Sequence, residues 1–288
     1  MSHAGAPVGG LLVLVDPVAR RLDGESVRIA KDVLSAGAAA KICLPDSQEE
    51  FARALARRGH RRPVVVGDDG ALVRAVGLLY GEPGAGDAAV SLVPVGAVGS
   101  LALARSLGVP LSVVFAARAA LDGVTRPRDL LVDDCGGVVL GGLRITAPSV
   151  SAARRTGGYR SLLRTLLPAQ AAAPGAGPGA GRPVQRLRVE VDGVVLVDED
   201  RPVEDVAVRP REDGGPARVV VRVRGGAPLT GYGDAVTVSV TGPAAAFHYR
   251  ADHAQPGAPA RRRTWTRHPS AWSLTLPRGP GSSGPAGL

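Results

Sequence analysis

The sequence is poor in cysteine and aromatic residues and has no long apolar run. Its 2 Cys, Cys43 and Cys135, cannot form a disulfide framework and lie in no C-x-x-C or Cys/His spacing, so we expect a reducing compartment and no structural zinc. No apolar run reaches about 18 residues, so no membrane-spanning helix is expected. The motifs G-x-x-x-x-G-K-[ST], G-x-S-x-G and H-E-x-x-H are absent, so P-loop, serine hydrolase and zinc protease sites are not predicted.

Basic charge is abundant but unevenly distributed. The net charge is +9 at pH 7; residues 1–150 hold 16 basic and 15 acidic residues, whereas residues 151–288 hold 19 and 11. Only Lys31 and Lys41 of the 35 basic residues are lysine, which together with the high Ala, Gly and Pro content is typical of GC-rich coding. Net charge alone predicts a binding partner weakly, so the basic excess does not by itself indicate nucleic-acid binding. We expect no nucleic-acid partner.

The first 130 residues alternate short apolar runs with amphipathic segments. Apolar runs typical of strands buried on both faces lie at Leu11–Val15, Ala39–Leu44, Pro63–Val66 and Val90–Val93. Helical spacing and helix-terminal charges mark Glu25–Ala36, Ser47–Arg58 and Ala71–Leu79, and the alternation continues through Leu101–Leu107, Leu111–Phe115 and an Ala-rich segment. Residues 1–130 are therefore predicted to form a parallel α/β domain with helices on both faces of the sheet.

Residues 131–277 change to short β runs, several of them with period-two alternation. Strands are predicted at Gly137–Leu140, Leu143–Thr146, Arg186–Val191, Val194–Val197, Val203–Val208, Ala217–Val223, Ala235–Val240, Ala246–Arg250 and Trp272–Leu276. These strands predict an antiparallel β-sandwich-like domain. A helix is expected over Tyr159–Leu167, a flexible Gly- and Pro-rich linker over 171–183 and a disordered tail over 278–288.

Three turns follow predicted strands and precede helices. They span Asp16–Arg20, Gly67–Ala71 and Pro94–Ser100. Ligands of open α/β sheets bind beyond the carboxyl ends of the strands, where glycine-rich turns into helix N-termini present free N–H groups to phosphates. The phosphate-binding candidates are Asp16, Gly67, Gly70, Gly96, Gly99 and Ser100. For an isolated G-D-D-G, the alternative is a tight strand-to-helix turn capped by Asp.

In order and spacing, these turns resemble motifs of the diacylglycerol-kinase-like lipid kinases, which share their nucleotide-binding arrangement with NAD kinases. The family's N-P-x-S-G, G-G-D-G-T and P-x-G-T-x-N-D correspond to the three turns, and its A-R-x-L-G-I-P corresponds to Ala104–Pro110. Its G-x-x-x-x-x-D-L is similar to Gly123 with Asp129-Leu130, and its V-E-V-D-G to Val189–Gly193. The resemblance covers residues 10–277. It tells strongly against NAD kinase, which lacks the A-R-x-L-G-I-P segment and has a different second half.

The resemblance implies an α/β domain and a β-sandwich domain with a cleft between them. In that cleft ATP and Mg²⁺ would meet a lipid hydroxyl, and the protein would position the reactants for in-line phosphoryl transfer. The expected partners are a lipid substrate or an anionic membrane surface, and a homodimer is compatible with the family. We expect a cytoplasmic protein with peripheral membrane contact.

Several polar positions of the family's motifs differ in this sequence. The first turn has Asp16 for Asn and Ala19 for Ser, and the second has Asp68 for Gly and Ala71 for Thr. In the third turn Thr, Asn and Asp are replaced by Ala97, Gly99 and Ser100. We therefore expect weakened or lost catalysis, the alternative being an inactive nucleotide- or lipid-binding module.

Asp69 and Asp252 are the candidate catalytic residues. Asp69 retains the acidic position of G-G-D-G-T, and the family's late D-G-E, whose Glu serves as general base, falls at Asp252-His253-Ala254. Because that Glu is absent, Asp252 or His253 is the remaining candidate base. A solvated loop pair is the alternative. His248 and His253 fall on opposite faces of a strand, so no shared metal is predicted and no metal ligands are assigned.

The basic segment Arg261–His268 has two interpretations. It contains four arginines and Trp265, so it could bind lipid headgroups or nucleic acid. A solvated loop before the last strand is the alternative, since one Trp is a poor stacking platform.

Overall fold

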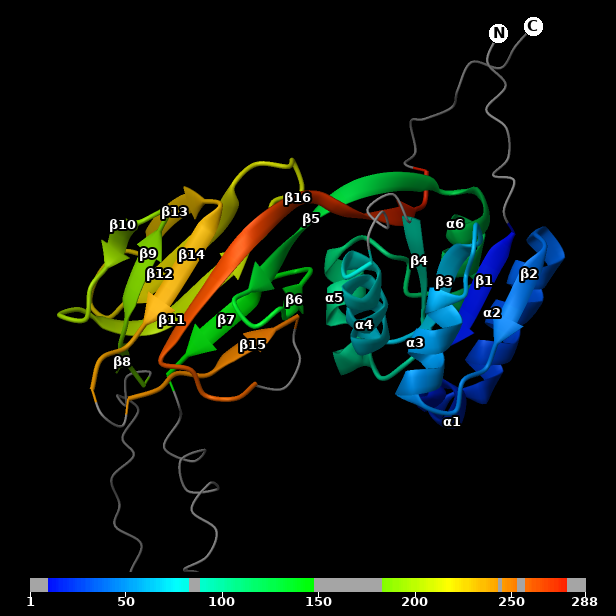
Figure 1. Cartoon of the computed structure of the whole chain (residues 1–288), viewed down its shortest axis with the longest axis horizontal. Coiled ribbons are helices and arrows are strands. Elements are labelled where there is room, and N and C mark those ends of the chain that lie inside the picture. Colours follow the sequence, from blue (N-terminus) through cyan, green and yellow to red (C-terminus); the bar gives the residue numbers. More distant parts are fainter. Residues whose placement is uncertain (1–9, 83–88, 148–182, 243–244, 253–256, 279–288) are drawn as a thin grey trace, which may run out of the picture.

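The computed structural model describes residues 10–82, 89–147, 183–242, 245–252 and 257–278. They form an α/β lobe and a β lobe, and two long strands run from one lobe into the other (Figure 1). The predicted helix over 159–167, and all but the end residues 183 and 278 of the predicted linker and tail, lie outside the described residues. Among the described residues, no helix has the length and hydrophobicity needed to cross a membrane.

The α/β lobe contains the predicted parallel sheet. Its strands are β1 (Leu11–Val15), β2 (Ala40–Cys43), β3 (Arg62–Gly67) and β4 (Ala89–Pro94), paired in the order β4-β3-β1-β2. Every residue of β1 is buried, because alternate side chains face opposite sides of the sheet: Leu12 and Leu14 join one apolar cluster and Leu11 and Val13 another. The apolar runs thus predicted these strands correctly.

Helices cover both faces of this sheet. They are α1 (Pro17–Leu22), α2 (Gly24–Gly37), α3 (Gln48–Ala56), α4 (Asp69–Tyr80), the 3₁₀ turn η2 (Val98–Ser100), α5 (Ala102–Ser106) and α6 (Val113–Asp122). Residues of α2 and α6 pack on one face, and residues of α3, α4 and α5 on the other. The predicted alternation, continued through Leu111–Phe115, implies a strand there, and this is wrong. Helix α6 begins at Val113, and Ala116, Ala117 and Ala120 form its buried stripe.

The β lobe is a sandwich of two sheets. One contains β7 (Leu143–Thr146), β8 (Gln185–Arg186), β11 (Pro202–Arg209), β12 (Ala217–Val223), β13 (Leu229–Gly233) and β15 (Tyr249–Ala251). The other contains β5 (Val124–Asp133), β6 (Val138–Val139), β9 (Arg188–Val191), β10 (Val194–Val197), β14 (Ala235–Ser239) and β16 (Arg262–Leu276), and it continues into the parallel sheet. A cluster of buried aliphatic side chains with Phe247 and Trp265 fills the space between the sheets. The antiparallel β architecture is confirmed.

Strand β16 joins the two lobes. It pairs antiparallel with β14 and β5, and its last residues pair parallel with β4 through Ser273 and Leu274. The register shifts between His268 and Trp272, where Ser270 has a φ of +49°. The sequence predicted only Trp272–Leu276 as strand, and the alternative of a loop over Arg261–His268 is wrong because residues from 262 onward belong to β16. Strand β5 likewise runs through the predicted domain limit at residue 130; the limits themselves stay a prediction.

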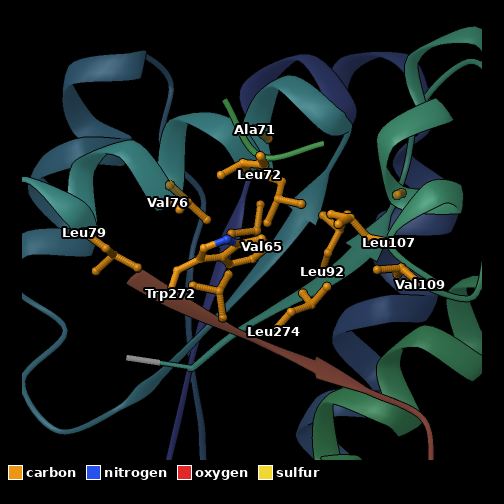
Figure 2. Close-up of a cluster of buried hydrophobic side chains, with 14 of the residues drawn as sticks. Val65, Ala71, Leu72, Val76, Leu79, Leu92, Leu107, Val109, Trp272 and Leu274 are labelled. Carbon is orange, nitrogen blue, oxygen red and sulfur yellow. The ribbon is translucent and has the colours of Figure 1, made fainter. Parts of the chain in front are cut away.

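The last part of β16 completes the core of the α/β lobe. Trp272 is buried against side chains of α4 and of strands β3 and β4 (Figure 2). Its indole Nε1 donates to the Asp129 carbonyl at 3.2 Å. The α/β core is therefore closed by a strand from the C-terminal end of the chain.

Candidate functional site at the strand ends and between the lobes

The structure brings the three predicted turns together. Strands β4, β3 and β1 are neighbours in the parallel sheet, so their carboxyl ends meet at one edge. A Cβ on Gly67 would lie 2.9 Å from the Asp16 Cβ, and a Cβ on Gly96 would lie 3.1 Å from the Asp68 Cβ. Glycine is therefore required at both positions for the turns to touch.

Asp16 caps the first turn. Its carboxylate is buried, accepts from the Val18 N–H at 2.8 Å and the Ala19 N–H at 3.4 Å, and pairs with Arg74 at 3.1 Å. The Arg74 guanidinium offsets the repulsion that a carboxylate would exert on a phosphate. Asp16 thus has a structural role in this turn, and its predicted contact to a phosphate remains a prediction.

The other two turns offer mainly backbone groups. Asp68 caps α4 by accepting from the Ala71 N–H at 3.1 Å, and Gly70 is exposed. Ser100 donates its hydroxyl to the Ala97 carbonyl at 2.9 Å, whereas nothing lies within 4 Å of where a Gly99 side chain would begin. A phosphate here would meet N–H groups of the α4 N-terminus but few side-chain donors.

Asp69 holds the start of α5. Its buried carboxylate accepts from the Leu103 N–H at 2.7 Å and the Ala104 N–H at 2.8 Å. Both N–H groups lie in the first turn of α5, where they lack partners within the helix. Asp69 therefore joins the G-D-D-G turn to α5, a segment that the resemblance links to A-R-x-L-G-I-P.

Asp252 performs the same task in the β lobe. Its carboxylate accepts from the N–H groups of Leu140 at 2.8 Å, Gly141 at 2.6 Å and Gly142 at 3.2 Å. Its φ of +49° is rarely adopted by residues other than glycine. Asp252 thus organises the β6–β7 turn, while the alternative candidate base, His253, lies outside the described residues.

The two candidate catalytic carboxylates lie on opposite sides of one contact between the lobes. On one side, Leu103 donates its N–H to Asp69. Its side chain packs so closely on Gly141 that a Cβ added to Gly141 would lie 2.5 Å from the Leu103 Cδ1. Gly141 in turn donates its N–H to Asp252. A Cβ at position 141 would force the Leu103 side chain to move. Asp69 and Asp252 are therefore linked through the contact between Leu103 and Gly141.

Replacement of Asp69 by alanine is expected to lower the free energy of unfolding by about 2 kcal/mol, because two buried N–H groups of α5 lose their acceptor. Urea denaturation followed by circular dichroism measures this loss. Asp69→Asn, which retains one acceptor oxygen, should lose less. Equal stability of Asp69→Ala and the wild type would contradict the capping role.

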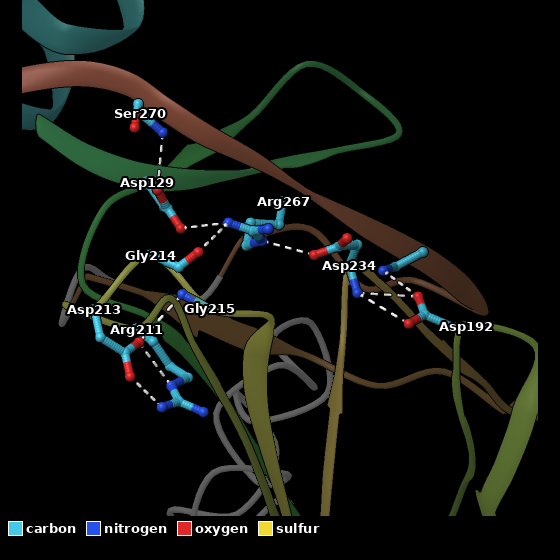
Figure 3. Close-up of polar contacts among 10 residues, drawn as sticks. Asp129, Asp192, Arg211, Asp213, Gly214, Gly215, Asp234, Arg267 and Ser270 are labelled. Carbon is cyan, nitrogen blue, oxygen red and sulfur yellow. Dashed lines mark hydrogen bonds and ion pairs between the residues drawn. The ribbon is translucent and has the colours of Figure 1, made fainter.

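A buried ion pair stands where β5 meets β16 (Figure 3). Asp129 accepts from Arg267 at 2.6 Å and from the Ser270 N–H at 2.8 Å, and Arg267 also donates to Asp234 at 2.7 Å. The hydrogen bond to Asp234, which outweighs burial, raises the pKa of Arg267 above its usual value. The Asp129–Arg267 pair could not be predicted from the sequence, because 138 positions separate the two residues.

A cavity of about 220 Å³ opens beside this pair. It is lined by residues 106–107 at the end of α5, residues 128–129 of β5, residues 140–141 and residues 209–212 at the end of β11. Gly141 is thus shared between the cavity and the contact that links Asp69 to Asp252.

The described residues do not assemble a magnesium site at the three turns. Asp16, Asp68 and Asp69 each accept backbone N–H groups, and the one group of at least three potential ligand residues among the described residues, Asp133, Asp134 and Cys135, lies at the β5–β6 turn. The backbone N–H groups at the α4 N-terminus suit the phosphates of a nucleotide, so the turns fit the nucleotide better than the metal.

Residues 11–132 match the family model of the diacylglycerol kinase catalytic domain. A search of curated protein sequences gives no match. The crystal structure of a diacylglycerol kinase from Bacillus anthracis str. Sterne aligns with a TM-score of 0.65 and 14% identity over 94% of this chain and 97% of its own. A further Bacillus anthracis structure gives a TM-score of 0.68 and 14% identity over 96% and 99%.

An NAD kinase from Archaeoglobus fulgidus, solved in complex with ATP, aligns with a TM-score of 0.51 and 12% identity over 92% of each chain. At these identities the structures show the fold alone. The fold is the α/β-plus-β-sandwich architecture shared with diacylglycerol kinases and NAD kinases.

Proposed function

We propose that the chain is a diacylglycerol-kinase-like protein whose ATP-dependent phosphoryl transfer to a lipid hydroxyl is weakened or lost. The match over residues 11–132 and the fold support the lipid-kinase ancestry. Phosphoryl transfer depends on positioning the reactants and on groups that stabilise phosphate charge and accept the hydroxyl proton. The state of those groups in the cleft is what favours weak or absent catalysis.

The observation that carries the proposal is the hydrogen bonding of Asp69 and Asp252. Both carboxylates accept at least two backbone N–H groups, which fix each side chain in place and occupy the oxygens that would otherwise face a substrate hydroxyl. The donors expected beside them are also reduced, because the Ser100 hydroxyl bonds to Ala97 and position 71 is alanine. Loss of one well-placed donor costs about 10²–10³ in rate.

The second candidate function is an inactive module that binds a nucleotide or a lipid. It is favoured by the contact between the three turns, since Gly67 and Gly96 preserve the backbone approach that a phosphate site needs even though the side-chain donors are missing. Calorimetric titration with ATP and Mg²⁺ separates the two: binding without transfer supports the module, and absence of both rejects the nucleotide site altogether.

The test of the main proposal is transfer of labelled phosphate from ATP to diacylglycerol and to a total lipid extract in vesicles with Mg²⁺. We expect transfer by the wild type at or near background. The triple variant Ala97→Thr, Gly99→Asn, Ser100→Asp restores the family's residues in an exposed turn with open space at Gly99, and it should raise the rate by about 10²-fold or more.

Asp69→Asn tests the same site in the opposite direction. Rapid lipid phosphorylation by the wild type that is abolished in Asp69→Asn would overturn the proposed loss of catalysis. Asp32→Asn, which changes an exposed carboxylate on α2, is the matched control and should behave as the wild type. Circular dichroism of each variant establishes that the fold is retained.

A further inference from the structure

The cavity between the lobes is lined by a mostly buried arginine that forms no hydrogen bond among the described residues. Arg128 lines the cavity, its side chain is 13% exposed, and its Nε is buried without a hydrogen-bond partner among the described residues. Its recorded ion-pair contact is to Glu212, at 3.7 Å from Nη1 to Oε1, which exceeds hydrogen-bond length. Because the Nε is not accessible from the cavity, a ligand there would reach Arg128 through its terminal guanidinium nitrogens, whose contact to Glu212 is long and weak.

A second guanidinium stands at the same cavity. Arg209 lines it at the end of β11, is exposed, and has no ion pair recorded within the described part of the chain. Its stem lies over Gly142, where an added Cβ would come within 2.7 Å of the Arg209 Cγ. Gly142 has a φ of +130° and donates its N–H to Asp252, so the backbone of this turn is held in place. The aliphatic part of the Arg209 side chain packs on this turn.

The other charged groups of the cavity are already paired or are easily displaced. Asp129 is held by Arg267 and the Ser270 N–H, so its charge is largely offset.

The remaining charged side chains are at the end of β11. Arg211 pairs with Asp213 and stacks over Tyr232. The Glu212 side chain is 77% exposed and can turn into solvent. Arg128 and Arg209 therefore leave the cavity with an excess of positive charge in a partly water-excluded space.

We propose that this cavity binds a phosphomonoester dianion between Arg128 and Arg209. Guanidinium groups bind phosphate oxygens through paired, charge-assisted N–H donors, and a phosphate offers enough oxygens for both. The volume of about 220 Å³ suits a phosphate with a small attached group. The phosphate could belong to a lipid, to the end of a nucleotide, or to free inorganic phosphate. Only this choice of sources rests on the proposed function.

The test is calorimetric titration of the full chain with inorganic phosphate, ATP and dihexanoyl phosphatidate, with neutral dihexanoylglycerol as the uncharged comparison. We expect binding of at least one phosphate compound and none of dihexanoylglycerol at the same concentrations. The compound that binds tightest identifies the source. Absence of binding by all three phosphate compounds up to millimolar concentration would overturn the proposal.

Substitutions assign the binding to the cavity. Arg209→Gln and Arg128→Gln should each weaken binding about tenfold, while Glu212→Gln, which removes the competing carboxylate, should strengthen it. Arg57→Gln, an equal charge change at the exposed end of α3, should leave the affinity unchanged. Arg209 and Glu212 are exposed, so these variants remain informative if Arg128→Gln fails to fold.

Unchanged affinity in both Arg209→Gln and Glu212→Gln would place the phosphate elsewhere and contradict the proposal. The titrations contain no lipid acceptor for ATP and measure no turnover, so their outcome is separate from the kinase assay. If phosphate binds in a way that depends on Arg209 and no lipid is phosphorylated, both the phosphate site and the weakened catalysis are supported. If lipid is phosphorylated but phosphate does not bind in this way, the phosphate site is contradicted independently of the kinase activity.

Discussion

Trp272→Ala is expected to lower the free energy of unfolding by about 3–5 kcal/mol. The side chain is buried among residues of α4, β3 and β4, although it belongs to the last strand of the chain. Its removal leaves a large cavity in the α/β core and takes the indole donor from the Asp129 carbonyl. Denaturant unfolding monitored by circular dichroism measures the loss.

Phe115→Ala provides the control for this prediction. Phe115 is 62% exposed on α6, so its truncation should change the free energy of unfolding by no more than about 0.5 kcal/mol. A similar, small effect of both substitutions would mean that β16 does not complete the α/β core. The variant Trp272→Phe, which retains most of the apolar volume, should fall between Trp272→Ala and the wild type.

Arg267→Met is expected to destabilise the chain by about 3 kcal/mol, because it leaves the Asp129 carboxylate buried without its cation. The side chains of Arg267 and Asp129 are 10% and 4% exposed, and the pair ties β16 to β5 at the register shift. Replacing Asp129 by asparagine in the same chain should restore part of the loss, because the buried charge is removed as well.

Thermal and denaturant unfolding of the single and double variants forms a double-mutant cycle for this pair. Arg28→Met is the control, since Arg28 forms a solvent-exposed pair on α2 and should have little effect. If Arg267→Met and Arg28→Met are equally stable, Asp129 is not held by Arg267 in solution. If the double variant gains nothing over Arg267→Met, the buried charge is not the cause of the loss.

The parallel sheet was predictable because β1, β3 and β4 are buried on both faces and each of its strands is followed by a helix or helix-terminal signal. Strand β2, at the edge of the sheet, is only partly buried, and its apolar run still marked it as a strand. The last strand was harder to predict. The first half of β16 contains Arg262, Arg263 and Pro269, which disfavour an isolated strand. Its arginines pair with acidic residues that are far away in the sequence. Strand β13 was missed because Gly231 and Gly233 interrupt its alternation.

The location of the candidate site was predictable from the rule that strand ends in a parallel sheet meet at one edge. The geometry supports that placement, since Gly67 and Gly96 bring the turns into contact. The partners of Asp69 and Asp252 could not be predicted, because both carboxylates bond to backbone N–H groups far along the chain. Nothing near Arg128 or Arg209 in the sequence indicates a shared cavity.

The initial rate of labelled phosphate transfer from ATP to diacylglycerol, measured side by side for the wild type and the Ala97→Thr, Gly99→Asn, Ser100→Asp variant, tests the central claim most directly. A wild-type rate near background and a rate about 10²-fold higher in the variant would support a lipid-kinase fold with weakened chemistry. A high wild-type rate that Asp69→Asn abolishes and that the triple variant leaves unchanged would contradict it.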